Sequence, residues 1–164
     1  MPSRPRAAVA AHKPSYTLEE GVFLGAMSTA DSLLRGLEEL LKPAGLTPSQ
    51  YNVLRILRGA GAEGLACREI SARMLTRDPD MTRLLDRLEA RGLVARARGV
   101  NDRRVVLTQI TAAGRKVLER LDAPVCELHK RQLQHMSDAD LRRLAALLEQ
   151  ARETSSKTEH PIRP

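Results

Sequence analysis

A short arginine-rich stretch has the clearest chemistry in this sequence. Residues 91–104 contain five arginines and one aspartate, a net charge of +4, while the whole chain carries +7. Guanidinium groups placed so close together repel one another unless an anion compensates them, and the phosphates of a DNA backbone are suited to that. Charges also protect the edge of a β-ribbon from aggregation, but that role does not require charges of one sign. The stretch therefore favours a polyanionic partner over edge protection alone.

The residues just before this stretch form a pattern that could read DNA bases. One face of the expected helix carries Asp80, Arg83, Arg87 and Arg91. Another face carries Met81, Leu84, Leu85 and Leu88. Such a helix can pack through its apolar face while its arginines bind guanine in the major groove, and Thr82 could contact a thymine methyl group or a phosphate. Charged faces are also common on ordinary solvated helices, so the helix by itself leaves both interpretations open.

Two aspartates stand where this helix should begin. We expect Asp78, which precedes Pro79, to be the N-cap, because a carboxylate there accepts from backbone N–H groups and suits the helix dipole. Asp80 could accept from a cytosine amine, or it could pair with Arg83 or Arg77. We favour the intramolecular pair, because a carboxylate beside phosphates is costly unless it is paired.

Hydrophobic periodicity and end signals predict the helices of the first half. Thr47 is followed three residues later by Gln50, and Thr17 by Glu20, a spacing typical of the capping box that starts a helix. Glycines mark the ends of the second and fourth helices. The expected helices cover about 17–42, 47–59, 67–75 and 78–91.

The second half begins with a change of period. Residues 93–98 and 103–110 are extended in character, and the four residues between them have turn composition, which predicts a β-hairpin. Thr111 should cap a long helix that Pro124 kinks or breaks, and a last helix should follow Ser137.

The order of elements predicts a mainly α fold with a small β-hairpin wing. In this fold a winged helix-turn-helix is flanked by N- and C-terminal dimerisation helices. Residues 1–15 contain three prolines and three basic side chains without an acid, which indicates a flexible basic arm. Residues 153–164 are expected to be a polar tail. The expected domain spans 16–152, with the winged helix-turn-helix at about 47–110 and the dimerisation helices at about 17–42 and 111–152.

Three motifs in this order resemble the MarR (multiple antibiotic resistance regulator) family of transcriptional regulators. Residues 46–54 (LTPSQYNVL) resemble the family's second-helix opening, and residues 81–94 (MTRLLDRLEARGLV) resemble its recognition helix running into the wing. Residues 101–104 (NDRR) and 110–114 (ITAAG) resemble its wing signature. The similarity covers about 17–150 and is specific as a set, although each motif alone is weak.

The resemblance implies a homodimer that binds double-stranded DNA at a pseudo-palindromic promoter site, usually as a repressor. Many members release DNA on binding a small phenolic or aromatic effector, and no other cofactor is implied. Each recognition helix should enter a major groove, while Arg104, positioned by Asp102, should reach a minor groove. The expected DNA contacts are Thr76, Arg77, Asp80, Thr82, Arg83, Arg87, Arg96, Arg98, Asn101, Asp102, Arg103 and Arg104.

The expected homodimer and its effector imply two further sets of residues. The expected dimer interface consists of Tyr16, Phe23, Val125, Leu128, Leu133, Leu141, Leu144 and Leu148. The expected effector pocket consists of Met27, Leu33, Tyr51 and Arg55, although core packing explains each of these residues singly.

Other functions are weaker candidates. A non-specific architectural DNA-binding protein would need only the basic wing and tails, and a redox-sensing regulator would act through Cys67 and Cys126. Cys126 with His129 and His135 lacks the spacing of a metal site, so no metal is expected. No nucleophile–base pair or phosphate-binding glycine loop stands out, so we do not expect an enzyme. Without a signal peptide or an apolar run of membrane length, the sequence favours a cytoplasmic protein.

Overall fold

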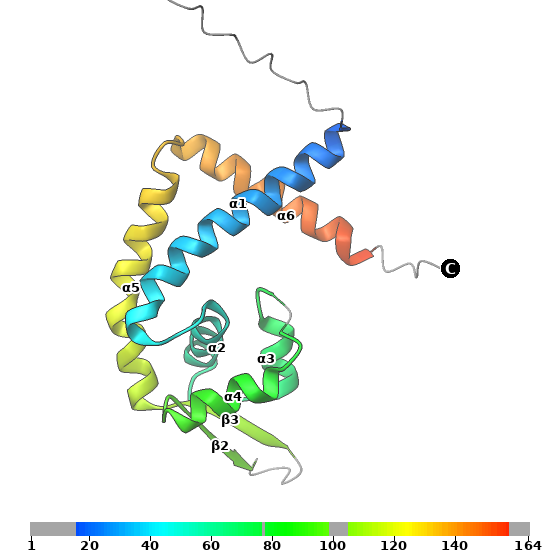
Figure 1. The fold of residues 1–164 in the computed structure, drawn as a ribbon. Helices are drawn as coiled ribbons and strands as arrows, with labels where there is room; N and C mark the ends of the chain where they lie inside the picture. The colour runs from blue at the N-terminus through cyan, green and yellow to red at the C-terminus, as the bar shows by residue number, and fades with distance from the viewer. Residues whose placement is uncertain (1–15, 77, 99–104, 158–164) are drawn as a thin grey trace, which may run out of the picture.

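The computed structural model describes residues 16–76, 78–98 and 105–157, with side chains as far as Arg152. The lower part of the molecule is a winged helix-turn-helix, and three long helices extend from it (Figure 1). The element order matches the predicted fold class. The elements are α1 (Leu18–Leu41), η1 (Lys42–Ala44), α2 (Pro48–Gly59), β1 (Leu65–Ala66), α3 (Cys67–Arg73), α4 (Met81–Ala90), β2 (Val94–Arg98), β3 (Val106–Ile110), α5 (Ala112–Leu133) and α6 (Asp138–Lys157).

Threonine caps start three of the helices as the sequence predicted. Thr17 and Thr47 form complete capping boxes with Glu20 and Gln50, in which each side chain bonds the other residue's backbone N–H. The Thr111 hydroxyl accepts from the Gly114 N–H at 3.1 Å. These bonds satisfy donors that a helix start otherwise leaves without a partner.

The start of α4 differs from the prediction by two residues. Its N-cap is Asp80, which accepts from the Arg83 N–H at 3.2 Å, so the assignment of Asp78 was wrong. Asp78 instead accepts from the Asp80 N–H at 3.0 Å and shapes the turn before the helix. Pro79 therefore precedes the helix and is not part of its first turn.

The wing belongs to a three-stranded antiparallel sheet in the order β1-β3-β2, not to a two-stranded ribbon. The hairpin pairs Val94 with Ile110 and Arg98 with Val106. The additional strand, β1, pairs Leu65 with Thr108. Two residues are too few to show a strand pattern in the sequence, and this strand exists because β3 offers it an edge.

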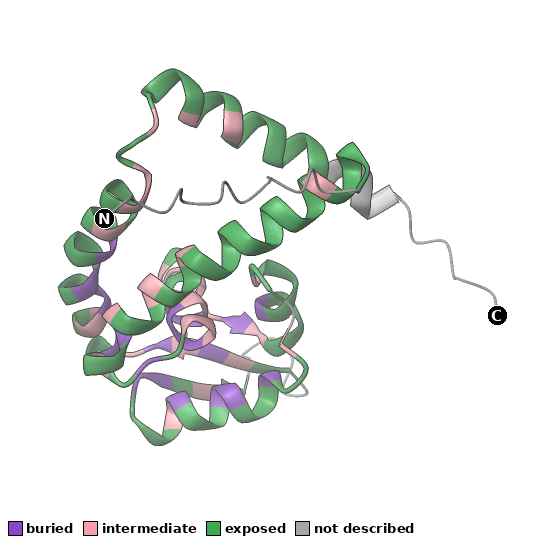
Figure 2. Ribbon diagram, turned by 45° about the horizontal axis from the view of Figure 1, so that its top comes forward, coloured by how far each residue is buried: buried purple, intermediate pink, exposed green. Residues whose placement is uncertain are grey.

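The hydrophobic core lies where α2, α4 and the sheet meet the adjoining ends of α1 and α5 (Figure 2). Leu54 and Leu57 of α2, Leu88 of α4 and Leu118 of α5 are completely buried. By contrast, the first half of α1 and all of α6 lie away from this core and carry exposed apolar side chains. The most exposed are Leu18, Val22, Phe23, Leu24, Met27, Leu147 and Leu148.

The two C-terminal helices differ from the expectation at one point each. α5 continues through Pro124 without a break. α6 extends to Lys157, past the start of the predicted polar tail at residue 153. Within the described part of the chain, no helix is long and apolar enough to span a bilayer.

Gly114 lets the first turn of α5 pack directly against the backbone at the start of the wing. A Cβ atom at this position would lie 2.3 Å from the Leu93 carbonyl oxygen and 2.8 Å from Cγ1 of Ile110. In addition, the Thr111 hydroxyl donates to the Gly92 carbonyl oxygen at 2.7 Å. The glycine of the family-like motif is therefore required by close approach of two backbones.

We expect Gly114→Ala to lower the free energy of unfolding by about 1–3 kcal/mol, because the new methyl group must displace backbone. The control is Gly59→Ala, whose Cβ would meet nothing within 4 Å. Because alanine has a higher helix propensity than glycine, Gly59→Ala should raise the free energy of unfolding by up to about 1 kcal/mol. Urea denaturation of both variants measures the difference, and a neutral or stabilising Gly114→Ala would contradict the close approach.

Candidate nucleic-acid interface

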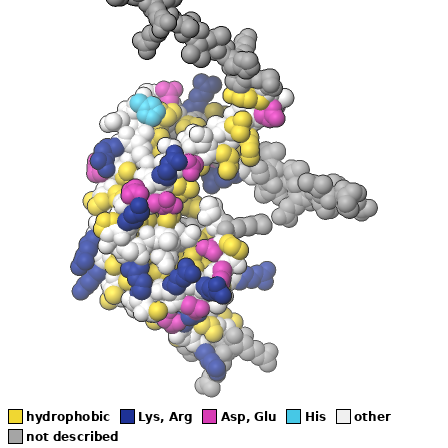
Figure 3. Space-filling model, in the orientation of Figure 1, with side chains coloured by type: hydrophobic (Ala, Val, Ile, Leu, Met, Phe, Trp, Pro, Cys, Tyr) yellow, Lys and Arg dark blue, Asp and Glu magenta, His cyan; other side chains and the backbone are white. Residues whose placement is uncertain are grey.

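α4 presents a polar face to solvent because its opposite face is buried. Met81, Leu84, Leu85 and Leu88 are each at most 6% exposed. The side chains that remain exposed on this helix include Thr82, Arg83 and Arg87. In Figure 3, basic side chains are spread over the lower half of the molecule, where the winged-helix part lies, with acidic ones among them. This distribution fits a surface that meets a polyanion through selected side chains.

Asp80 pairs within the chain, as favoured from the sequence. Its Oδ2 lies 3.2 Å from Nε of Arg83, while its Oδ1 caps the helix. The Arg83 side chain is 76% exposed. An exposed pair of this kind contributes little stability, so Arg83 can exchange the carboxylate for another anion at small cost.

Arg96 is half-buried and bound by carboxylates of its own chain, whereas the sequence argument expected a free cation of the wing. Its Nε donates to Glu89 Oε2 at 2.8 Å, its backbone N–H donates to Glu89 Oε1 at 3.1 Å, and its Nη2 donates to Asp86. Two carboxylates of α4 thus supply the compensating anions that the sequence argument assigned to phosphate. Arg96 fastens β2 to α4, so a DNA phosphate would have to compete with two carboxylates for its guanidinium.

These bonds also shift the pKa values of Glu89 and Arg96. The hydrogen bond from Arg96 holds the pKa of the Glu89 carboxyl below its ordinary value of 4.5. The carboxylates of Glu89 and Asp86 in turn raise the pKa of Arg96. The sequence indicates that Asp86 and Glu89 offset the charge of the helix, but not that they pair with Arg96, because nothing local shows that this side of α4 meets β2.

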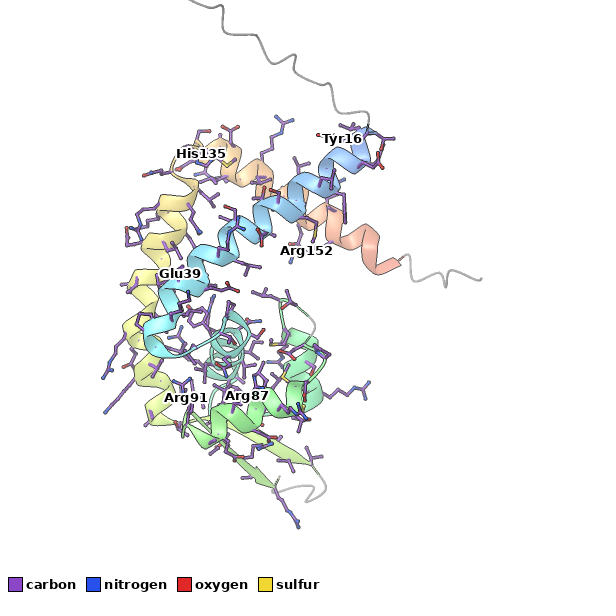
Figure 4. The ribbon with its side chains drawn as sticks, in the orientation of Figure 1. Tyr16, Glu39, Arg87, Arg91, His135 and Arg152 are labelled. Carbon is purple, nitrogen blue, oxygen red and sulfur yellow. The ribbon has the colours of Figure 1, made fainter. Side chains whose placement is uncertain are left out.

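Arg91 also leaves the face to which helical spacing assigned it. It follows the last residue of α4 and has φ −90° and ψ 1°, so its side chain no longer continues the Arg83–Arg87 row. Its Nη2 donates to the Ala44 carbonyl oxygen at 2.8 Å, and its Nη1 donates to the Gly45 carbonyl oxygen. Figure 4 labels Arg87 on this helix and Arg91 at its end.

The remaining predicted contacts divide into two groups. On the described part of the chain Thr76, Thr82, Arg87 and Arg98 are exposed, and Thr76 lies close to the start of α4. None of the ion pairs formed among the described residues involves Arg87 or Arg98. The predicted contacts that lie outside the described residues are Arg77, Asn101, Asp102, Arg103 and Arg104.

A separate pocket of about 220 Å³ lies between α1, α2 and α5. Leu33, Tyr51 and Arg55 line it as expected, whereas Met27 does not and is 59% exposed. The guanidinium of Arg55 lies 5.8 Å from the centre of the Tyr51 ring, within cation–π range. Burial raises the pKa of Tyr51 above its ordinary value of 10.0, so its hydroxyl remains a donor at neutral pH. The other lining residues are Leu34, Leu37, Pro48, Ser49, Asn52, Leu75, Thr76 and His129.

The predicted dimer-interface residues are not all on one surface. Tyr16, Phe23 and Leu148 are exposed, and Leu141 and Leu144 are half-buried. Leu128 and Leu133 are also half-buried. Val125 is 5% exposed and belongs to the core of its own chain, so little of its side chain is left to contact a second subunit.

The cysteines and histidines of the described residues form no evident site. Cys67 and Cys126 are exposed free thiols on α3 and α5. Within the ranges that the structure describes, no three His, Cys, Asp or Glu residues are grouped so as to hold a metal ion.

Comparison with known proteins places this geometry in a family. The model of the MarR family matches residues 44–105. The transcriptional repressor MdtR of Bacillus subtilis is 33% identical over 122 residues, which cover 73% of this chain and 77% of that protein. The chain belongs to the MarR family. The MarR family consists of transcriptional regulators, so the family prediction and the fold class are both confirmed.

Solved MarR-family structures share the fold along most of the chain. A MarR transcription factor from Planctomyces limnophilus is 40% identical, with 82% of this chain and 97% of that chain covered and a TM-score of 0.64. A mutant MarR from Escherichia coli, complexed with operator DNA, is 29% identical with 84% and 99% covered and a TM-score of 0.72. CouR of Rhodococcus jostii RHA1, bound to p-coumaroyl-CoA, is 27% identical with 91% and 100% covered and a TM-score of 0.70.

The Arg96–Glu89 contact should make stability sensitive to acid. Because the pKa of Glu89 is lowered from 4.5 in the folded state, the stabilisation is complete above that pH and is lost as the pH falls through the lowered value. As the pH falls from about 5 to about 3, we expect the melting temperature of Glu89→Gln to decrease less than that of the wild type. Glu63→Gln, an exposed change before β1, should follow the wild type. Equal acid dependence of Glu89→Gln and the wild type would contradict this assignment.

Proposed function

We propose that this MarR-family protein is a homodimeric, sequence-specific repressor that binds a pseudo-palindromic DNA site in the cytoplasm. The observation that carries the proposal is the orientation of α4. Its apolar face is buried and its flank is fastened to β2, which leaves Thr82, Arg83 and Arg87 on a solvent-facing surface. A helix held in this way can enter the major groove without rearranging. The E. coli relative bound to operator DNA and the repressor MdtR support the same role.

A second copy of the chain is the partner that fits the exposed apolar helices. The first half of α1 carries exposed leucines and Phe23 away from the core, and α6 exposes Leu147 and Leu148. Apolar surface of this extent marks an association site. With two copies joined there, the two α4 helices would present matching surfaces to two half-sites of DNA.

The wing would add contacts that position the protein on DNA. Arg98 is exposed at the end of β2, while Arg103, Arg104, Asn101 and Asp102 follow in the stretch outside the described residues. We assign Arg104 to the minor groove, as the family resemblance implies, and Arg103 to the phosphate backbone or the minor groove from the cluster of arginines in the wing. Arg96 is not part of this set, since its guanidinium is bound by Asp86 and Glu89.

We expect Arg87→Ala to weaken operator binding by about 1–3 kcal/mol and to relax the base preference at one position of each half-site. The reason is that Arg87 is exposed on the reading face and has no carboxylate partner among the described residues. Arg120→Ala removes the same charge from an exposed site on α5, so it controls for long-range attraction. Fluorescence anisotropy with operator variants measures both effects.

The same titrations test the proposal against a non-specific DNA-binding protein. A specific repressor should bind a DNA site selected from random sequence at least about a thousandfold more tightly than unrelated DNA of equal length. Equal affinity for both, or equal effects of Arg87→Ala and Arg120→Ala, would contradict sequence-specific recognition by α4.

We also propose that the pocket between α1, α2 and α5 takes a small aromatic or phenolic effector. Its wall is apolar, from Leu33, Leu34 and Leu37, while Tyr51 and Arg55 provide a hydrogen-bond donor and a cation. This combination suits a flat ring that carries an acidic group. The aromatic acyl ligand of CouR supports the assignment by analogy.

We expect hydroxylated benzoates or cinnamates to raise the melting temperature by several degrees at saturation and to weaken operator binding, because they bind the folded state. Arg55→Ala should abolish the thermal shift, while Arg120→Ala should keep it. Differential scanning fluorimetry across these compounds is the measurement. An unchanged shift in Arg55→Ala would contradict the assigned pocket.

A further inference from the structure

Arg91 holds the end of the recognition helix against the end of α1. Its guanidinium donates to the carbonyl oxygens of both Ala44 and Gly45, residues that follow α1 directly through η1. The two segments are 46 and 47 residues apart in sequence. Carbonyl groups at a helix C-terminus lack partners within the helix and carry partial negative charge, so a two-pronged cation is a favourable partner there.

The backbone at Gly45 is shaped for this contact. Gly45 has φ 64°, and a Cβ atom on it would lie 3.3 Å from Nη2 and 3.6 Å from Cζ of Arg91. The guanidinium therefore rests directly against the Cα of a residue that has no side chain. A lysine could supply the charge but not the planar fork that reaches two carbonyls at once.

The rest of α4 is separated from α1 by a cavity. This cavity has a volume of about 430 Å³ and is lined by Leu34 and Glu38 of α1, by Arg83 and Arg87 of α4, and by the first turn of α2. The two helices are therefore not in continuous contact along their lengths. Arg91 joins them at one end, while the apolar face of α4 is packed in the core of the winged-helix part, so this contact relates that part to the end of α1.

We propose that Arg91 is a positioning residue that sets the angle of α4 relative to α1, and hence the separation of the two recognition helices in the dimer. The inference rests on the proposed function, because α1 belongs to the proposed dimer surface. A fixed separation of recognition helices makes a dimer sensitive to the spacing of its half-sites. Arg91 contributes to that selectivity without touching DNA.

The first test measures the geometry without DNA. A spin label is attached at Thr82→Cys, near the far end of α4, in a Cys67→Ser, Cys126→Ser background, and the label-to-label distance in the dimer is recorded by pulsed electron paramagnetic resonance. We expect one narrow distance distribution in the otherwise wild-type protein and a broader or displaced one with Arg91→Ala or Arg91→Lys. An Arg91→Ala dimer that folds and keeps the narrow distribution would overturn the proposal.

The second test measures spacing selectivity with the selected operator and versions lengthened by one or two central base pairs. We expect the wild type to lose at least about tenfold in affinity per inserted base pair, and Arg91→Ala and Arg91→Lys to lose less than about threefold. The salt dependence of Arg91→Ala should equal that of the wild type, because no phosphate contact is removed. Arg87→Ala should keep the wild-type spacing preference.

Different failures have different meanings in this experiment. If the salt slope of Arg91→Ala falls by about 1.8, or about 0.9 for each subunit, Arg91 contacts phosphate and the positioning role is wrong. If Arg91→Lys keeps the wild-type spacing selectivity, a positive charge alone is sufficient and the positioning role of the guanidinium fork is wrong. If Arg91→Ala weakens all spacings equally, the contact serves stability only, and the proposal is again wrong. If the wild type shows no preferred operator, the proposed function itself fails, whatever the distance measurement shows.

Discussion

Burial of one face of α4 is the constraint on which the DNA-facing surface depends. This helix has only 10 residues, too few to be stable in isolation, so both its helicity and its orientation come from packing. Met81, Leu84, Leu85 and Leu88 all lie in the core. Once they are buried, the helical period directs Thr82, Arg83 and Arg87 outward, so core packing and the reading surface are two consequences of one pattern.

The arginines around this helix fall into two physical classes. Arg91 and Arg96 are each bound by more than one acceptor of the same chain, and they tie α4 to α1 and to β2. Arg83 has one exposed carboxylate partner, and Arg87 has none in the part of the chain that the structure describes. Net charge alone therefore overestimates how many positive side chains are free to contact DNA. Arg91 and Arg96 contribute to the net charge, but their guanidinium groups are bound within the chain.

Local features were predictable from the sequence, and long-range ones were not. Thr17, Thr47 and Thr111 cap their helices through bonds to residues three positions away, a spacing that can be read directly. The acceptors of Arg91 lie 46 and 47 residues away, and the pairing of β1 with β3 spans a similar stretch. The N-cap of α4 is an exception among the local features: it is Asp80 and not Asp78, two residues of the same type that the local sequence does not distinguish.

The proposed effector pocket and the bonds that Arg91 makes from α4 involve the same helix, α1. The pocket is bounded by α1, α2 and α5, and a bidentate ion pair between Arg58 and Asp122, with bonds of 2.7 and 2.9 Å, joins α2 to α5. Because α2 is fixed to α5 in this way, a ligand could widen the pocket by moving α1, at the cost of contacts between α1 and α5 such as the 3.0 Å bond from Gln132 Nε2 to the Leu33 carbonyl oxygen. Arg91 connects the end of α1 to α4, so such a movement would reach the recognition helix. A ligand can alter DNA affinity through this route only if it binds the two arrangements of α1 with different affinity.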